Sequence, residues 1–244
     1  MNENIQIFLN SKRADKYVNG QTGDCIFHLP HINIKRSSSI TVSILSAVIP
    51  YSFYNVNSNN DKLVYRINNN PIETIVLTHS NYNINTLIKH LMELLGSNFL
   101  IIYNASSNKL TFSNHLDEFE LDMLSTCFEL IGFSNIDHVS NSRLLVSDNV
   151  VNLFTYRTLH IVSDNFILGN IDSYNPNKSN ILASIPINTI FNGIISYSNI
   201  HNVSNEINNT RNLSYLHIQL TNQDGNIIEF NNAHWSITLL LSIK

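Results

Sequence analysis

The histidines are the first residues whose types and spacing could support chemistry. His28 and His31, in His28-Leu-Pro-His31, have a spacing compatible with two metal ligands. His201, His217 and His234 could act as acid–base groups if the fold brings them to an Asp or a Ser. The sequence shows no further ligand for the first pair, so polar residues at a strand end are the simpler interpretation. We therefore predict no metal site and no catalytic residue.

Acidic residues concentrate at one place, formed by Asp117, Glu118, Glu120 and Asp122. Carboxylate oxygens bind Ca²⁺, but these residues do not follow the spacing of an EF-hand loop. A solvated acidic face is the favoured interpretation of this segment.

The two cysteines, Cys25 and Cys127, lie far apart in the sequence. This spacing fits neither a disulfide framework nor a zinc pattern, so each is interpreted as a small buried or surface residue. The sequence also lacks the GxSxG, HExxH, GxxxxGK[ST] and GxGxxG motifs. We accordingly expect no enzyme activity and no cofactor.

The amino-acid composition is low in charged residues and rich in asparagine. Charged residues make up 13% of the 244 positions, against about 25% in a typical domain, and 40 asparagines replace much of the missing charge. The asparagine excess reflects an A/T-rich genome, an amide-wetted surface, or both.

The net charge of −4 and the lack of a dense basic patch argue against direct nucleic-acid binding. No signal peptide and no 18-residue apolar stretch is present, so we expect no membrane span and a reducing compartment.

Most apolar segments alternate with period two and end at turn residues, as β-strands do. The strongest is 40–50, with Ile40, Val42 and Ile44 followed by Ala47 and Ile49. Asp224-Gly225 is a strong hairpin signal between two further strands. The remaining predicted strands cover residues 159–162, 166–168, 181–186, 189–197, 214–220, 226–230 and 235–243. This pattern predicts an all-β fold of antiparallel strands, which protects its sheet edges as a jelly-roll β-sandwich or as a barrel.

One region departs from the strand pattern. Residues 83–96 place leucines and isoleucines on one helical face, with Asn83 as N-cap and Gly96 as C-cap. Residues 118–133 give a weaker helical signal, and predicted hairpins flank the first helix at 63–77 and 99–112. We therefore expect a small α+β subdomain inserted in the jelly roll. The rival arrangement is two sequential domains.

The expected boundaries follow from this pattern. Residues 1–58 form the first part of the jelly roll, 59–137 the inserted subdomain, and 138–244 the second part of the jelly roll. A polar N-terminal arm covers about residues 1–24 of the first part. Its alternative is a disordered leader.

Tyr51, Phe53 and Tyr54 form a dense aromatic stretch after Pro50. Exposed aromatic rings could stack on sugars, which would suit a carbohydrate- or receptor-binding jelly-roll module. The favoured interpretation is that these rings pack in the interior at a strand end, and Trp235 is likewise expected in the core.

Several segments together are similar to one family. The sequence AVIPYSFYNVNSNN (47–60) resembles the IP-x-S-x-YN segment of the minor capsid, or penton, proteins of virophages and polinton-like viruses. THSNYNINTLIKHLMELL (78–95) resembles their G-N-Y turn and leucine-spaced helix, although His79-Ser80 replaces the glycine. YNASSNKLTF (103–112) resembles their hairpin, with Ile131-Gly132-Phe133 after it. The segments at 181–199 and 216–241 resemble the family's C-terminal motifs, and Asn231-Asn232-Ala233 stands where many relatives have Asn-Gly.

The resemblance implies that the fold is a single jelly-roll β-sandwich and that the protein has a structural role in an icosahedral virion. Five copies would form a homopentamer, the penton, at each fivefold vertex of the capsid, beside a double-jelly-roll major capsid protein. The protein would be assembled in the cytoplasm or virus factory of the host cell. Residues 59–137 would be available to a spike or a host receptor.

The N-terminal arm suggests where such a protein would contact its neighbours. Its segment from Ser11 to Asp24 is polar and rich in turn residues. We predict that Lys12, Arg13, Lys16 and Tyr17 contact the next subunit or the major capsid protein.

Overall fold

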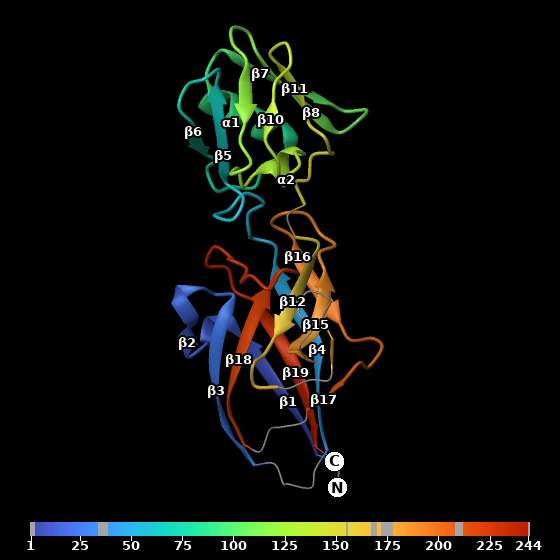
Figure 1. Cartoon of the computed structure of the whole chain (residues 1–244). Helices are drawn as coiled ribbons and strands as arrows, with labels where there is room; N and C mark the ends of the chain where they lie inside the picture. The colour runs from blue at the N-terminus through green and yellow to red at the C-terminus, as the bar shows by residue number, and fades with distance from the viewer. Residues whose placement is uncertain are drawn as a thin grey trace. The chain divides into compact units, whose positions relative to one another are not determined.

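The computed structural model describes residues 3–33, 39–154, 156–166, 170–171, 178–207 and 212–243. The chain divides into two compact units, and each has its own hydrophobic core. The first, called here the body, comprises Met1–Phe53 and Tyr156–Lys244 (Figure 1). The second, called the inserted unit, comprises Tyr54–Thr155. Within the described ranges, no helix is long and apolar enough to cross a membrane.

Two antiparallel sheets make up the body (Figure 1). One has the order β1-β19-β4-β16, with β17 also paired to β4, and the other has the order β15-β12-β18-β3-β2. Their long strands are β1 (Glu3–Asn10), β3 (Asp24–Asn33), β4 (Ile40–Pro50), β12 (Thr158–Val162), β15 (Ile181–Pro186), β16 (Ile194–Ser198), β17 (Asn205–Ile207), β18 (Asn212–Thr221) and β19 (Ser236–Ile243).

The pairing of these strands is that of a jelly roll. If β16 and β17 count as one interrupted strand, the body has eight strands, and the first pairs with the eighth and the second with the seventh. The third pairs with the sixth, and the fourth with the fifth. This nested order is what results when one long hairpin is rolled into two sheets. The expected all-β jelly roll with an inserted α+β subdomain is confirmed.

Short elements complete the body. They are η1 (Ser11–Arg13), β2 (Lys16–Tyr17), η2 (Val18–Gly20), β13 (Asn170–Ile171) and β14 (Lys178–Ser179). β2 adds a short outer strand to β3, and β13 pairs with β14. The described part of the expected N-terminal arm, residues 3–24, is therefore built into the body as β1, η1, β2 and η2.

Strand β4 shows how the sequence pattern sets the packing. Val42 and Ile44 are buried, and so are Ala47 and Ile49, although the parity of the positions changes between the two pairs. The change occurs where the pairing of β4 with β19 shifts register, which leaves Leu45 as an extra residue. A β-bulge of this kind keeps both halves of the strand facing the core.

The core of the body lies between the two sheets. Trp235 is 1% exposed, and its indole N–H donates to the carbonyl oxygen of Thr22 at 2.7 Å. Phe27 packs edge-on against the indole ring, with ring centroids 5.9 Å apart. The expectation that Trp235 belongs to the core is confirmed.

Seven strands and two helices form the inserted unit. One sheet has the order β10-β9-β5-β6 and the other β11-β8-β7, and the buried side chains form a separate core. The elements are β5 (Lys62–Ile67), β6 (Glu73–Val76), α1 (Ile84–Leu95), β7 (Phe99–Asn104), β8 (Lys109–Asn114), β9 (Phe119–Leu121), α2 (Phe128–Ile131), β10 (His138–Val139) and β11 (Leu144–Val146).

Helix α1 has the predicted caps. The Asn83 side chain accepts hydrogen bonds from the backbone N–H groups of Asn85 and Thr86, and Gly96 ends the helix at a φ of 88°. Leu87, Leu91 and Leu95 are buried along one face. An N-cap side chain satisfies N–H groups that have no partner within the helix, which fixes where α1 begins.

The helix predicted over 118–133 is wrong for most of its length. The buried Phe119 and Leu121 alternate with the partly buried Glu120 in β9, which pairs with both β5 and β10. Only Phe128–Ile131 is helical. Residues 119–121 form a strand rather than a helix because β9 pairs with two other strands, and no local pattern reveals these partners.

Two predicted strands are shorter than expected. In the segment 226–230, only Ile227 forms a bridge, to Thr221, because the Asn222 side chain accepts the N–H groups of Asp224 and Asn226 and closes the turn. The strand expected at 189–197 begins at Ile194. Of the strand expected at 166–168, only Phe166 is described, and its side chain is buried.

The ends of the insertion lie close together within each unit. In the body, the rings of Phe53 and Tyr156 are 5.5 Å apart by their centroids. In the inserted unit, the Asn55 amide donates to the carbonyl oxygens of Tyr82 (2.8 Å) and Leu153 (3.4 Å). The inserted unit begins five residues earlier than the expected 59–137 and ends eighteen later. The later end follows from β11, which pairs with β8.

Asparagine occupies many turn positions whose backbone φ is positive, a conformation that glycine usually adopts. Among the described residues other than glycine, nine have positive φ, and seven of them are Asn19, Asn68, Asn108, Asn192, Asn202, Asn231 and Asn232. Asparagine tolerates this conformation better than other residues with a Cβ atom. The chain has only seven glycines, so part of its asparagine excess builds tight turns.

Candidate interaction surface

His28 lies on β3 and contacts Asp15. The backbone N–H of His28 donates to the Asp15 carboxylate at 2.7 Å, and its ring nitrogen lies 3.5 Å from the same oxygen. The backbone N–H lowers the pKa of Asp15 most, followed by the charge of the His28 ring. The side chain of His31 lies outside the described residues. Over the described part of the chain, no three His, Cys, Asp or Glu side chains are grouped to hold a metal ion.

The imidazole ring of His217 contacts two carboxylates. Its Nε2 lies 2.5 Å from Asp24, which is buried, and its Nδ1 lies 3.3 Å from Asp164. Gln219 donates to the other oxygen of Asp24 at 3.2 Å. Asn165 fixes this strand further, because its side chain accepts from the His217 backbone N–H and donates to the Tyr215 carbonyl. The group connects strand β18 to β3 and to the turn after β12.

His234 and His201 differ in their surroundings. His234 Nδ1 lies 3.2 Å from the hydroxyl of Ser11, and that hydroxyl also accepts the backbone N–H of Trp235. Ser11 is fully buried, so this pair joins η1 to the start of β19. His201 lies on an exposed turn. The sequence identified these histidines but could not show which of them had partners.

Each residue of the acidic group contacts a donor of the inserted unit. Asp117 accepts from the Asn68 amide, Glu120 pairs with Arg66, and Asp122 accepts the backbone N–H of Leu124.

Glu118, the fourth member of that group, accepts the hydroxyl of Ser140 at 2.6 Å and the backbone N–H of Arg143 at 3.0 Å. The Ser140 hydroxyl contributes most to the lowered pKa of this carboxyl. Together, the four carboxylates bind the protein's own donors and join segments of this unit.

Both cysteines are buried and reduced. Burial raises the pKa of Cys25 to about 12, and that of Cys127 also to about 12. The thiolate is the reactive form of cysteine, so both side chains are inert in the folded protein.

We therefore expect no reaction of the native chain with a thiol reagent such as Ellman's reagent at pH 8. With a pKa of about 12, only about one thiol in ten thousand is ionised at that pH. Both thiols should react once the chain is unfolded in guanidinium chloride, which serves as the internal control. Rapid labelling of either cysteine before unfolding would contradict the burial described here.

Tyr51 and Phe53 of the aromatic stretch belong to the body, and Tyr54 is the first residue of the inserted unit. Phe53 is 2% exposed and packs against Tyr51, Tyr156 and Phe230, with ring centroids 4.4 to 5.8 Å apart. Tyr51 also meets Phe191 edge-on. Rings used in this way have little free face for stacking on a sugar.

The four predicted contact residues lie on one short stretch of the body. Lys12, Arg13 and Lys16 are exposed on η1 and β2. Tyr17 is partly buried against the core, and its hydroxyl donates to the Ser11 carbonyl at 2.7 Å. The stretch is thus a folded, basic turn held by Tyr17. Its contact with another chain stays a prediction.

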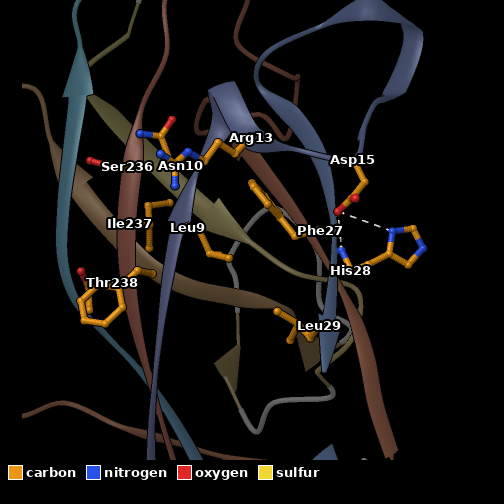
Figure 2. Close-up of a pocket in the computed structure, with 11 residues that line it drawn as sticks. Leu9, Asn10, Arg13, Asp15, Phe27, His28, Leu29, Ser236, Ile237 and Thr238 are labelled. Atoms are coloured by element: carbon orange, nitrogen blue, oxygen red, sulfur yellow. Dashed lines mark hydrogen bonds and ion pairs between the residues drawn. The ribbon is translucent and has the colours of Figure 1, made fainter. Parts of the chain in front are cut away.

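A cavity of about 550 Å³ opens beside this turn, where the two sheets meet at an edge. Figure 2 shows Leu9 and Phe27 facing the cavity from different strands, with Arg13, Asp15 and His28 near its rim. The lining comes from β1, η1, β3 and β19 and from the turn that carries Asp15, and it comprises Phe8, Leu9, Asn10, Arg13, Asp15, Phe27, His28, Leu29, Ser236, Ile237 and Thr238.

Sequence reasoning did not find this cavity. Its lining residues come from both ends of the chain, and they meet only because β1 pairs with β19 while β3 lies in the other sheet. One signal was present in the sequence: Phe8 alternates with the buried Ile7 and Leu9, so a large apolar ring points away from the core.

Comparison with known proteins supports the fold alone. No protein-family model matches the chain, and no curated protein matches it in sequence. Among solved structures, the mavirus penton protein matches over 99% of this chain and 100% of its own length. The TM-score is 0.53 and the sequence identity is 10%. The chain therefore shares its overall fold with that protein along the full length of both chains.

Proposed function

We propose that this chain is a structural capsid protein, a penton subunit that forms homopentamers at the fivefold vertices of an icosahedral virion. The observation that carries the proposal is the match to the mavirus penton protein over the full length of both chains. The motifs shared with minor capsid proteins of virophages and polinton-like viruses support it, because they are spread over the sequence in the same order.

The residues fit a structural role. His28, His217, His234 and the carboxylates described above contact the protein's own donors and acceptors, and the cysteines are inert, so the proposal includes no enzyme activity and no cofactor. Low charge and abundant amides suit wet, hydrogen-bonded contacts between subunits. The partners proposed are further copies of the chain and a double-jelly-roll major capsid protein. Assembly would take place in the cytoplasm or virus factory of the host cell.

The inserted unit is the part proposed to meet a spike or a host receptor. The face of its three-stranded sheet that points away from the core carries Ile102 (53% exposed), Leu144 (46%) and Val146 (47%). Ile102 and Val146 both lie opposite Thr111, so they share one row of the sheet. An exposed aliphatic sheet face of this kind is typical of a contact surface.

The oligomeric state tests the proposal. We expect native mass spectrometry of the purified chain to show a species of about 139 kDa, which is five copies of 27.8 kDa. Co-expression with the major capsid protein of the same virus should place this chain at the vertices of closed shells seen by electron microscopy. A trimer in solution and shells whose vertices lack the chain would contradict the proposal and favour the receptor-binding alternative.

A further inference from the structure

We propose that the body binds an extended peptide segment of another protein, which adds to the sheet as a new strand along β1. The segment carries apolar side chains at alternate positions and a carboxylate at the end beside Arg13. This inference goes beyond the proposed function, because it assigns a binding surface and the chemistry of the partner that fits it. Three features carry it, namely an unpaired strand edge, an apolar cavity and an unpaired guanidinium group.

Strand β1 lies at the end of its sheet and pairs with β19 on one side only. The Ser11 N–H, one residue beyond β1, donates to the Trp235 carbonyl at 3.0 Å. Bonded residues alternate along an antiparallel pair, so the N–H and C=O groups of the odd-numbered residues of β1 point to β19. Those of Asn4, Gln6 and Phe8 point to the open side, where no described strand pairs with them. This edge therefore offers donors and acceptors at the spacing of a strand.

The β1 edge lacks the features that keep sheet edges from pairing. Native edges are usually protected by short length, charges, prolines or bulges. β1 has eight residues in an unbroken register, no proline, and a single charged residue, Glu3, at its N-terminal end. It is longer than β2, β15, β16 and β17, the strands at the other sheet edges of the body. A long open edge is what the addition of a peptide strand requires.

The edge of β3, the other strand that flanks the cavity, is protected by contrast. Strand β2 pairs with Cys25 and Ile26. The backbone N–H of His28 donates to the Asp15 carboxylate at 2.7 Å, and Pro30 has no N–H to donate. The chain thus blocks one side of the opening between the sheets and leaves the other side free. This difference identifies β1 as the strand with which the added segment pairs.

The cavity provides space for an apolar side chain of the added strand. Leu9 and Ile237 line it from the sheet of β1, and Phe27 and Leu29 line it from the sheet of β3 (Figure 2). Leu29 and, farther along β1, Ile5 are only partly buried against the core. Side chains alternate between the two faces of a sheet. Every second side chain of the added strand would therefore point between the two sheets, where these neighbours favour apolar residues.

Phe8 lies on the outer face of the same edge. Its side chain is 75% exposed, because it alternates with the buried Ile7 and Leu9, and it lies at the cavity. A cross-strand neighbour that covers such a ring stabilises a strand pair. An added strand would supply this neighbour from its outward-facing side chains.

The charge at the rim of the cavity favours a carboxylate on the partner. Arg13 lies at the rim, just after β1 ends, and forms no ion pair with any described residue. Asp15 at the same rim already contacts His28, whose ring nitrogen lies 3.5 Å from the carboxylate. Lys12 and Lys16 add positive charge on the same turn. An acidic residue at the matching end of the added strand would pair with Arg13 and fix the register of the strand.

A library of random nonapeptides displayed on phage tests this surface. We expect selection on the purified chain to enrich peptides with apolar residues at alternate positions and an Asp or Glu near one end. The most enriched peptide is then synthesised with a fluorescent label, and its Kd is measured by fluorescence anisotropy. This peptide is the probe for every variant below.

Gln6→Pro should raise the Kd of the probe about tenfold, because proline removes an outward N–H that the added strand needs. Proline is tolerated on an edge strand where the N–H faces solvent, so the body should still fold, which circular dichroism can verify. Gln6→Val keeps the N–H and is the matched control.

Charge reversal at Arg13 provides a second variant that leaves the strand edge unchanged. Arg13→Glu should raise the Kd of the probe about tenfold, and a probe whose acidic residue is replaced by lysine should bind this variant better than the wild-type chain. Arg157→Glu is the matched control, because Arg157 is an exposed arginine of the body outside the cavity. Equal affinities of the Arg13→Glu and wild-type chains for the probe would overturn the assignment of a carboxylate.

Hydrogen exchange resolved by residue measures the strand edge itself. In the free chain, the amides of Gln6 and Phe8 should exchange fast and those of Ile7 and Leu9 slowly, since only the second pair is bonded to β19. The probe should slow the exchange of Gln6 and Phe8 about tenfold or more. Slow exchange of these two amides in the free chain would show that the edge is already covered, and would overturn the proposal.

The remaining outcomes separate this surface from the proposed pentamer. If no peptide is enriched, or if Gln6→Pro leaves the Kd of the probe unchanged, the strand-binding surface is overturned and the pentamer stands. Dissociation of the pentamer by Gln6→Pro in native mass spectrometry would show that a second copy occupies β1, and would also overturn the proposal. We expect an intact pentamer that binds the probe and loses it through Gln6→Pro.

Discussion

Replacement of Trp235 by alanine should lower the free energy of unfolding of the body by about 3–5 kcal/mol. The indole is 1% exposed, is the largest fully buried side chain of the described chain, and packs edge-on against Phe27. Its removal leaves a cavity between the two sheets, and it also leaves the Thr22 carbonyl without its 2.7 Å hydrogen bond. Urea unfolding followed by far-ultraviolet circular dichroism measures the loss, since the only tryptophan is gone.

Trp235→Phe is the matched control for this experiment. Phenylalanine keeps much of the ring but removes the indole N–H, so the loss should be smaller. About 0.5–1.5 kcal/mol of it should come from the lost hydrogen bond, since the Cys25 thiol still donates to the Thr22 carbonyl at 3.3 Å. A loss below about 1 kcal/mol for Trp235→Ala would show that the indole is not packed as described.

Gly132→Ala should destabilise the inserted unit by about 2–4 kcal/mol, from the sum of backbone strain and overpacking. Gly132 ends α2 with a φ of 81°, and a Cβ atom there would lie 2.5 Å from the backbone oxygen of Asn149. That segment cannot move easily, because the Asn149 N–H donates to the Gly132 carbonyl at 2.8 Å.

Gly96→Ala separates the two causes. Gly96 ends α1 in the same unit with a φ of 88°, but a Cβ atom there would meet no atom within 4 Å. Only the backbone strain remains, and a ψ of 173° places Gly96 in a region that almost only glycine adopts, so we expect a loss of about 1–3 kcal/mol. Thermal unfolding of both variants under one condition compares them, and a loss of about 1 kcal/mol or less for Gly132→Ala would mean that the contact with Asn149 is relieved at no cost.

Local patterns predicted the elements whose stability is local. Helix α1 was predicted with both caps because Asn83, Gly96 and the leucine spacing all lie within one short segment. Strand β4 was predicted with its bounds, and even the change of parity after Ile44 was visible as a break in the alternation. The α+β insertion was apparent because its hairpins and helix interrupt a long run of strands.

The failures occurred where distant partners decide the structure. Residues 118–121 gave a helical signal, yet β9 forms because β5 and β10 flank it on both sides. The nested order of the eight body strands also joins residues more than 200 positions apart, such as Glu3 and Ile243. No periodicity within one strand specifies its partner, so the jelly roll could be inferred only from strand count and resemblance.

The candidate surface was predictable only in part. The basic residues Lys12, Arg13 and Lys16 were chosen for their polarity, and the structure shows them exposed on a folded turn next to a cavity. The cavity needs β1, β3 and β19 together, and these strands are brought side by side only by the pairing of the two chain ends. Surfaces made from several distant strands are therefore the part of this protein that the sequence alone conceals.

The adjacent ends of the insertion have a consequence for how such proteins change over generations. The body meets the inserted unit at Phe53 and Tyr156, whose rings touch, so the eight-stranded framework is complete without the residues between them. Recombination at these two adjacent chain positions can exchange or remove the inserted unit without re-pairing any strand of the body. The inserted unit can then vary in sequence and length while the eight-stranded framework keeps its own core.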